Sequence, residues 1–389
     1  MKSRYRPKER NGAPARFLRE PLRGGPARRL AEARENAAKP FVGITAEGTP
    51  ERGLFTLANP GLGFALDTLA AAARGWLNSL EPEQREAARF VVDAPEWRLW
   101  CNIHPFLVRH GQLLESLDGQ GREAGLALAR EALSPAGFQT VRDVMRLNET
   151  VRELTGKDEE YGEWLYWLSL FGEPSASGPW GFQLDGHHLN LSVLALGGQL
   201  VLTPTFLGSE PVEADAGAYA GTRVFAKEEA LGLALMRALP ATLQRQATVG
   251  QELPDDVLGT AFRDNLVLGY AGVRFADMPG DAQALARRLM AVYIGRAREP
   301  HASAWQKQAE AHLGQTWFAW MGGIGDADAF YYRLHNPVLL IEFDHQDGLV
   351  LESDGPSRHH IHTLVRTPNG NDYGTDLLRQ HRERFPHPH

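Results

Sequence analysis

Two histidines separated by a single residue, His360 and His362, are the strongest chemical signal in the sequence. They lie in the stretch 359–366, whose alternation of polar and apolar residues predicts a β-strand. In a strand, His360 and His362 share one face with Arg366, whereas His359 lies on the other face. Two imidazoles spaced in this way can bind one metal ion. Such a pair is common by chance, so its weight depends on the residues around it.

Histidines are crowded toward the end of the chain, where ten of the fourteen lie after residue 300. A second group is the adjacent pair His187 and His188. If the stretch 185–192 is a strand, His188 lies on a small, polar face with Gly186 and Asn190, which is how the floor of a site looks. His187 lies on a face that is otherwise apolar. We therefore favour His188 as a site residue and His187 as a hydrogen-bonded core residue that supports the site from behind.

Two carboxylates, Glu342 and Asp344, project from one face of the predicted strand 338–345. A carboxylate within an apolar strand is costly to bury unless a cation compensates its charge. One interpretation is an ion pair with Arg333 or Arg366. The other is that Glu342 is a metal ligand beside the histidines.

The segment after the His360 strand offers three further candidates. The stretch 367–374 is dense in turn-forming residues. Within it, Asp372 could cap the following helix or orient a ligand histidine. Either Tyr373 or His381 could transfer protons during catalysis. His381 follows Leu377 by four residues, so we expect it on the inward face of a closing helix. The alternative for His381 is a partly buried residue stabilised by the helix dipole.

These residues together predict a site for one divalent metal ion, zinc, iron or manganese. The candidate ligands are His188, Glu342, His360 and His362. Two histidines and one carboxylate would leave open positions for water and a small-molecule substrate. Arg366 would bind an anionic or carboxylated group of that substrate, with Arg333 in support.

The hypothesis that follows is a metal-dependent enzyme. A zinc-like ion would activate water for hydrolysis of an ester or amide bond, and iron would suit an oxygenase-type oxidoreductase. We favour hydrolysis slightly, because Glu342 and Asp344 could divide the roles of ligand and base. The alternative is a metal-free binding or structural protein whose polar cluster orders the sheet. Metal analysis of the purified, untagged protein separates these hypotheses.

Other kinds of site are not supported by the sequence. The phosphate-binding motifs GxGxxG after a strand and GxxxxGK[ST] are missing, as are the GxSxG and HExxH motifs of hydrolases. The glycine-rich stretch 322–326 has no lysine or threonine placed to bind phosphate. Cys101 is the single cysteine, which excludes an intramolecular disulfide and a zinc site with several thiolates.

The composition is that of an ordinary globular protein. The chain has 389 residues, 43% of them hydrophobic, and a net charge of −7. Residues 1–40 carry twelve basic and four acidic side chains, a local charge of +8. The stretch has no apolar core, so we do not expect it to be a secretory signal peptide. We interpret it as a poorly ordered tail. The rest is acidic, so a nucleic-acid partner is not expected. Apolar runs are too short to span a membrane, and the expected location is the cytoplasm.

The helices and strands that the sequence predicts around these residues indicate an α+β fold. Residues 41–389 form a single large domain in this interpretation, with a helical part at about 60–171 and a sheet-rich part at about 172–389. The expected architecture is a helical N-terminal layer followed by a mostly antiparallel sheet flanked by helices. Ser134-Pro135 predicts the start of one helix, and Gly197-Gly198 predicts the turn of a β-hairpin. There is no repeat with a period between 20 and 50 residues, and the oligomeric state stays open.

Several motifs resemble those of the bacterial domain-of-unknown-function family 3500. They are FGEPSASGPWGFQLDGHHLNL, TPTFLGSEP, YYRLHNPVLLIEFD, HHIHTLVRTPNGNDYG and the final LLRQH. The resemblance extends from about Phe41 to His381. It implies that a shared framework includes Gly186, His187, His188, Glu342, Asp344, His360, His362, Arg366, Asp372, Tyr373 and His381. The family has no established reaction, so the resemblance supports the site and leaves the chemistry open.

Overall fold

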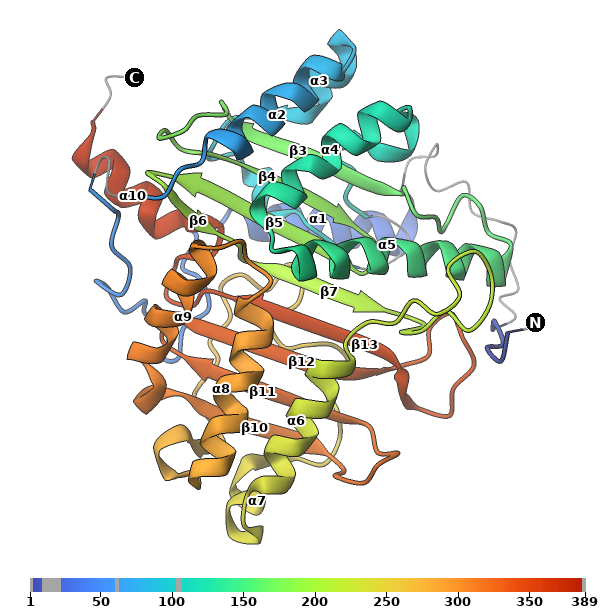
Figure 1. Ribbon diagram of the computed structural model, residues 1–389, viewed down its shortest axis with the longest axis vertical. Helices are drawn as coiled ribbons and strands as arrows, with labels where there is room; N and C mark the ends of the chain where they lie inside the picture. The colour runs from blue at the N-terminus through green and yellow to red at the C-terminus, as the bar shows by residue number, and fades with distance from the viewer. Residues whose placement is uncertain (1–2, 9–21, 60–62, 103–106, 387–389) are drawn as a thin grey trace.

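A single sheet of 13 strands runs through the molecule (Figure 1). The computed structural model describes residues 3–8, 22–59, 63–102 and 107–386. The strands are β1 (Arg89–Phe90), β2 (Gln112–Leu113), β3 (Tyr166–Gly172), β4 (Trp180–Gly186), β5 (Leu189–Leu196), β6 (Gln199–Val201), β7 (Thr205–Ser209), β8 (Thr248–Gly250), β9 (Val273–Arg274), β10 (Trp317–Gly322), β11 (Phe330–Asn336), β12 (Leu339–Asp347) and β13 (Pro356–Arg366). Their pairing is antiparallel except for β1 with β3 and β8 with β10.

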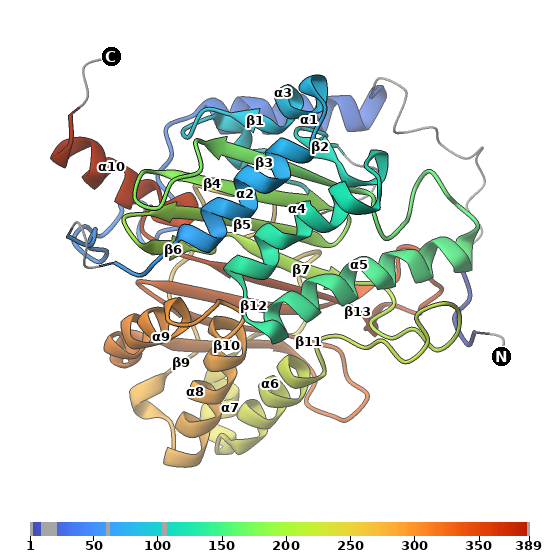
Figure 2. The same cartoon turned by 45° about the horizontal axis from the view of Figure 1, so that its top comes forward.

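Helices cover one face of this sheet, as Figure 2 shows for α2 and α4 over β3 to β5 and for α5 beside β7. The helices are α1 (Gly24–Ala38), α2 (Asp67–Ser79), α3 (Pro82–Ala88), α4 (Gly119–Ala132), α5 (Pro135–Thr155), α6 (Ala226–Ala238), α7 (Ala241–Ala247), α8 (Gly280–Ile294), α9 (His301–Ala311) and α10 (Thr375–Arg384). The predicted α+β architecture is thus confirmed. The helical part ends earlier than predicted, because Tyr166–Gly172 is a buried strand.

Local sequence explains why the elements begin and end where they do. Helix α5 starts where the sequence predicts it, because the Ser134 side chain accepts a hydrogen bond from the Gly137 amide and Pro135 occupies the first turn. It ends at Gly156, whose positive φ suits a helix C-cap. The predicted Gly197-Gly198 turn joins β5 to β6.

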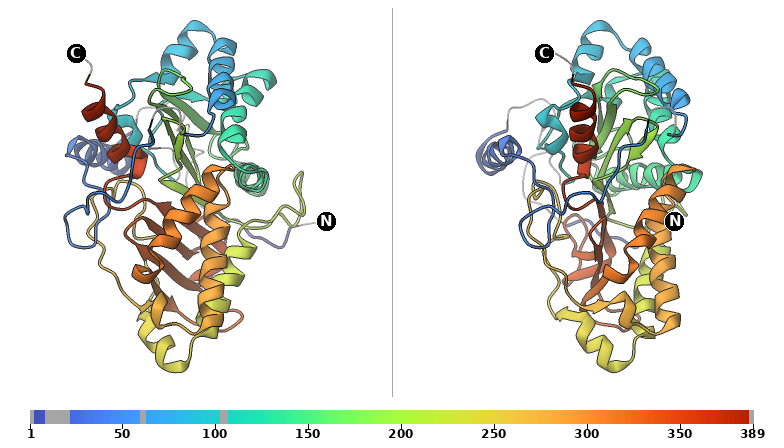
Figure 3. Two further views of the ribbon diagram at one scale, coloured as in Figure 1. Left: turned by 60° about the vertical axis from the view of Figure 1, so that its left-hand side comes forward. Right: turned by 90° about the vertical axis from the view of Figure 1, so that its left-hand side faces the viewer.

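The two faces of the sheet have separate apolar cores. On the helix-covered face, Trp76 of α2, Met145 of α5 and Met290 of α8 pack with strand residues such as Ile341. On the other face, which we call the loop-covered face, a second core is formed by side chains from the strands, the loops and α10, including Trp97, Trp100, Phe206, Leu364, Tyr373 and Leu377. Helices α1 and α10 lie on this side, opposite α4, α5, α8 and α9 (Figure 3). The candidate site is on the loop-covered face.

The order of strands in the sheet is symmetric about its centre, because corresponding strands of the two halves follow one another in the same order from each edge. Its order is β1-β3-β4-β5-β7-β13-β12-β11-β10-β8, and β7 pairs with β13 at the centre, with Thr205 opposite Val365. Both halves have a parallel edge strand (β1, β8), a short antiparallel strand (β2, β9) and three helices in the same order (α2–α4, α6–α8). In the part of the chain that the structure describes, the two halves therefore share one order of strands and helices. We call the β7–β13 pair the seam.

Part of the basic N-terminal segment packs on the rest of the protein. Tyr5 is buried in a small cluster with Val350, whose carbonyl oxygen accepts a hydrogen bond from the Lys8 amide. Ala33 and Ala37 of α1 contact a group of apolar side chains, Leu99, Cys101, Leu107 and Val108. The sequence predicts a poorly ordered tail here, whereas the described parts form a helix and specific contacts. The composition of the segment does not predict these contacts, because a few apolar side chains among many charged ones are enough to form them.

Deletion of residues 1–38 is expected to lower the melting temperature by about 3 °C or more. The deletion uncovers the apolar side chains beneath α1 and removes the Asn36 and Ala37 carbonyls, to which the Arg98 guanidinium donates. A loss of one to two kcal/mol shifts melting by roughly this amount in a large domain. Differential scanning calorimetry measures the shift, and an unchanged melting temperature would show that the contacts are not stabilising.

Among the described residues, no helix combines the length and apolarity that crossing a bilayer requires. The cytoplasmic location and the small-molecule partner stay predictions.

Candidate functional site

Three histidine rings meet where the first half of the chain touches the second. His188 comes from the turn between β4 and β5, and His360 and His362 come from β13. The His360 Nε2 atom lies 3.1 Å from the Nε2 atoms of both other rings. Among the described residues this is the one group of three or more potential ligands that could hold an ion, and all three side chains are buried. The predicted strand phase of His360 and His362 is confirmed, since both rings lie on the same face.

The nitrogen separations fit a shared metal ion. With metal–nitrogen bonds of about 2.0–2.1 Å, two ligand nitrogens lie about 2.9 Å apart at a right angle and about 3.3 Å apart at a tetrahedral angle. The observed separation of 3.1 Å falls between these values. The two separations from His360 are therefore those of ligands of one ion.

The hydrogen bonds on the far side of two rings define their tautomers. His360 Nδ1 donates to the Asp347 carbonyl oxygen at 2.6 Å, and His362 Nδ1 donates to Asp256 Oδ1 at 2.8 Å. In a neutral ring with Nδ1 protonated, Nε2 carries only a lone pair. Burial, together with the nearby His362, lowers the pKa of His360 to about 3, so this ring is neutral at pH 7. The lone pair of His360 Nε2 therefore faces the Nε2 atoms of His188 and His362, each 3.1 Å away, and is available to a cation.

Acidic groups stand behind these histidines in the arrangement typical of metal sites. Burial alone would raise the pKa of Asp256, but the interaction with His362 and a hydrogen bond from Thr260 lower it below its usual range. The Glu210 carboxylate lies 3.6 Å from His360 Nδ1 and accepts hydrogen bonds from the amides of three consecutive residues, Leu349, Val350 and Leu351. Sequence reasoning missed both acidic residues. Asp256 lies in a segment without a motif, and Glu210 lies in the motif TPTFLGSEP but has no histidine near it in the sequence.

His187 and His188 occupy a tight turn, which corrects the prediction of one continuous strand through both residues. His188 has a φ of 60°, and its backbone is held on both sides by hydrogen bonds to Asn102 O and from Gly208 N. The His187 ring stacks on the His188 ring at 4.0 Å and hydrogen-bonds to Asn148. His187 therefore supports the site from behind, in line with its predicted role.

A glycine makes room for the rings. A Cβ atom on Gly208 of β7 would lie 2.8 Å from His362 Cδ2 and 3.2 Å from His188 Cδ2. Real side-chain contacts are essentially never shorter than 3.0 Å. A side chain here would therefore push the imidazoles apart.

Glu342 and Asp344 lie on the predicted face of β12, but Glu342 is not part of the histidine group. Its carboxylate accepts hydrogen bonds from the Leu258 and Gly259 amides, both at 2.8 Å, and from Tyr331 Oη at 2.6 Å. Its oxygens thus hold a loop. The sequence predicted compensation by Arg333, Arg366 or a metal ion, whereas in the structure two backbone amides and a tyrosine hydroxyl compensate the carboxylate.

Asp344 lies directly beside the histidines. It is the cross-strand neighbour of His362, so their side chains share one face of the sheet. The Gln346 amide donates to Oδ2, whereas the buried Oδ1 atom has no hydrogen-bond partner in the part of the chain that the structure describes. Burial, and then the charges of Asp256 and Glu342, raise the pKa of Asp344 well above its usual range. The protonated form of Asp344 is therefore favoured relative to an exposed aspartate.

The two predicted substrate-binding arginines are buried in the protein. Arg366 is fully buried and donates to the Gly259 carbonyl oxygen, to Asp264 and to Asp372. Arg333 is 4% exposed and donates to the Gly269 carbonyl oxygen. The structure thus places both guanidinium groups in roles that hold loops on the sheet.

The remaining candidates lie around Arg366 and along α10. Burial raises the pKa of Asp372 to about 6, although Arg366 opposes this shift, and Thr367 N donates to the same carboxylate. The Tyr373 hydroxyl donates to Asp264 and accepts from Trp100 Nε1. His381 is half-buried on α10 beside Phe385, outside the histidine group.

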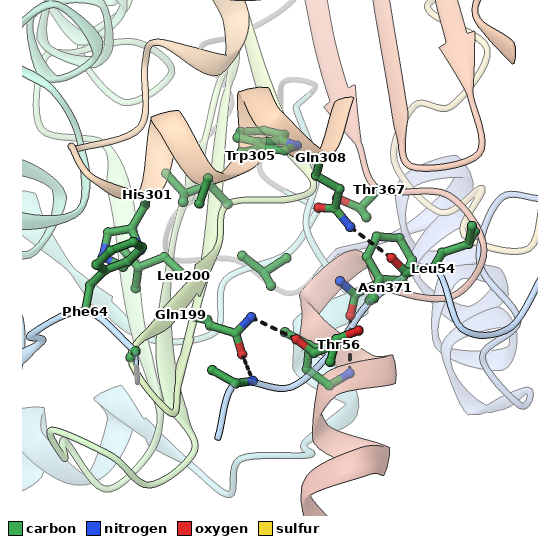
Figure 4. A pocket seen from close by; sticks show the side chains of 18 residues that line it. Leu54, Thr56, Phe64, Gln199, Leu200, His301, Trp305, Gln308, Thr367 and Asn371 are labelled. Atoms are coloured by element: carbon green, nitrogen blue, oxygen red, sulfur yellow. Dashed lines mark hydrogen bonds between the residues drawn. The ribbon is translucent and has the colours of Figure 1, made fainter. Parts of the chain in front are cut away.

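A separate cleft of about 390 Å³ lies between β6, α9 and the segment 54–58 (Figure 4). Two of its amide side chains are engaged with that segment. Gln199 bonds to Thr56 O and Ala58 N, and Gln308 Nε2 donates to Leu54 O. None of the candidate site residues lines this cleft.

Comparison with known proteins supports the resemblance. Residues 63–375 match the sequence profile of a family described as a protein of unknown function, DUF3500. Searches of the curated proteins and of the solved structures found no match. The matched range includes His188, His360, His362 and Asp344. The chain therefore belongs to the DUF3500 family.

Proposed function

We propose that the protein is a metal-dependent hydrolase whose ion is bound by His188, His360 and His362. The observation that carries this proposal is that His360 Nε2 lies 3.1 Å from the Nε2 atoms of both His188 and His362, while the His360 and His362 rings are held by Nδ1 hydrogen bonds. His360 Nε2 is thus held as an acceptor beside two further ring nitrogens, which is the arrangement that a bound cation would use. The ion is zinc, iron or manganese.

The ligand set favours hydrolysis over oxygen activation. The iron alternative rests on two histidines and one carboxylate, with Glu342 as the carboxylate. Glu342 instead accepts bonds from the Leu258 and Gly259 amides, and the third nitrogen comes from His188. Three neutral histidines form a known catalytic zinc set, which leaves a position for water. When bound, such an ion lowers the pKa of water toward 7.

The protein's own residues have distinct roles in this scheme. Asp344 Oδ1 is the free carboxyl oxygen beside His362, and we assign it the proton transfer. Three neutral ligands leave the charge of the ion uncompensated within the group, which favours a small anionic or carboxylated substrate. The ion thus takes over the role that the sequence suggested for Arg366.

Replacement of Asp344 with Asn tests this proposal, with zinc content and hydrolysis of 4-nitrophenyl hemisuccinate as readouts. We expect one ion per chain in the wild type and in Asp344→Asn, and a rate at least about 100-fold lower in the variant. Asp354→Asn changes an exposed carboxylate outside the site and should keep the wild-type rate. A wild type without stoichiometric metal, or an Asp344→Asn protein with full activity, would contradict the proposal.

A further inference from the structure

The segment of residues 256–264, which we call the Asp256 loop, crosses the loop-covered face directly above the carboxylate of Glu342. Glu342 is fully buried, and its two oxygens accept the Leu258 and Gly259 amides, one each. A Cβ atom on Gly259 would lie 3.0 Å from Glu342 Oε2 and from Leu364 Cδ2. The loop therefore lies against the sheet without space to shift inward.

Arg366 holds the same loop by its carbonyl groups. Its Nε atom donates to Gly259 O at 2.8 Å, one terminal nitrogen donates to Thr260 O at 3.3 Å, and the other lies 2.9 Å from Asp264. Asp264 in turn pairs with Arg98 at 2.9 Å. Glu342 thus accepts hydrogen bonds from the amide groups of this stretch of backbone, and Arg366 donates hydrogen bonds to its carbonyl groups. Groups of the protein itself therefore compensate both side chains.

The loop presents the Asp256 carboxylate to the site. Asp256 Oδ1 accepts from His362 Nδ1 and from the Val257 amide, both at 2.8 Å, and Oδ2 accepts from the Thr260 hydroxyl at 2.7 Å. These bonds tie the carboxylate to the loop's own backbone. The direction in which His362 points its Nε2 atom therefore depends on the position of the loop.

We propose that Glu342 is a positioning residue for the metal centre: it holds the Asp256 loop so that Asp256 orients His362. The inference rests on the proposed metal site and adds to it a line of contact from Glu342 through the loop and Asp256 to a ligand. Partners of this kind behind a ligand histidine contribute 10- to 100-fold to metal affinity. If Glu342 has only a structural role, its replacement lowers the stability of the fold, and any effect on metal affinity does not depend on Asp256.

A double-mutant cycle distinguishes these two roles, with Zn²⁺ affinity measured by competition with a chromogenic chelator. Glu342→Gln and Asp256→Ala should each weaken binding at least about tenfold. If Glu342 acts through Asp256, the double variant should bind no more than about threefold more weakly than Asp256→Ala alone. Co²⁺ bound to either single variant should show the same shifted absorption spectrum.

Glu210→Gln is the matched control. It also alters a buried carboxylate that accepts backbone amides, but it lies beside His360 rather than behind Asp256. In the Glu210→Gln, Asp256→Ala double variant, the fold-losses of Zn²⁺ affinity of the two single variants should multiply. If Glu342→Gln does not fold, Tyr331→Phe removes only the hydroxyl that donates to Glu342 and enters the same cycle. Multiplicative effects for the Glu342 or Tyr331 variant would overturn the inference, whereas a wild type that binds no metal would overturn the proposed function instead.

Discussion

Replacement of His360 or His362 with Ala should reduce bound divalent metal to less than about a tenth of the wild-type content. Each variant leaves two of the three converging nitrogens, and the unfolded chain cannot assemble the site. Because bound metal stabilises the folded state by mass action, about 4 kcal/mol at a thousandfold excess over Kd, chelator should lower the melting temperature of the wild type by several degrees. It should barely affect His362→Ala. Elemental analysis and calorimetry with and without chelator measure both effects.

His359→Ala is the control for this prediction. The side chain of His359 is exposed and contacts the ring of Tyr5, away from the three Nε2 atoms. The variant should keep the wild-type metal content and the wild-type response to chelator. Loss of metal in His359→Ala, with metal retained in the other two variants, would contradict the prediction, because the metal site would then lie on the face of β13 that carries His359.

A chain that stops after Asn369 should fail to fold. The truncation removes Leu377 and Leu378, both buried in the second core, and it takes Asp372 away from the buried Arg366. Loss of two buried leucines costs on the order of 4 kcal/mol or more, and breaking a buried ion pair costs about 3–5 kcal/mol. Together they approach or exceed a typical stability of about 5–15 kcal/mol. Circular dichroism on heating should show no cooperative transition.

A chain that ends at Pro386 serves as the reference, because it keeps α10 and every described residue. It should melt like the full-length protein. A cooperative transition together with metal binding in the shorter chain would show that α10 and Asp372 are dispensable for fold and site.

The parts of the site that follow from strand alternation could be predicted from the sequence. Alternation is a local property, so it placed His360 and His362 on one face and Glu342 beside Asp344. The ligand role of Glu342 could not be decided in this way. Whether its carboxylate faces an ion or backbone amides depends on the loop that crosses it, and nothing in β12 itself specifies that loop.

The turn at His187 and His188 shows a second limit. Histidine is not a typical turn residue, so the sequence around this pair resembles an uninterrupted strand. In the second half of the molecule the corresponding turn is formed by Pro337 and Val338 directly after Asn336, and Asn336-Pro337 is a sequence that does predict a break. The fold imposes the same hairpin on both, because β4 with β5 and β11 with β12 occupy equivalent places in the sheet.

The seam also determines when the site can come into existence. During synthesis the first half of the chain leaves the ribosome with one of the three histidines, His188, and the other two follow 172 and 174 residues later. Neither half alone holds more than two of the nitrogens. The three histidines therefore come together only when β13 joins β7, a contact between distant parts of the chain that forms slowly. Metal uptake by the nascent protein would report the joining of its two halves.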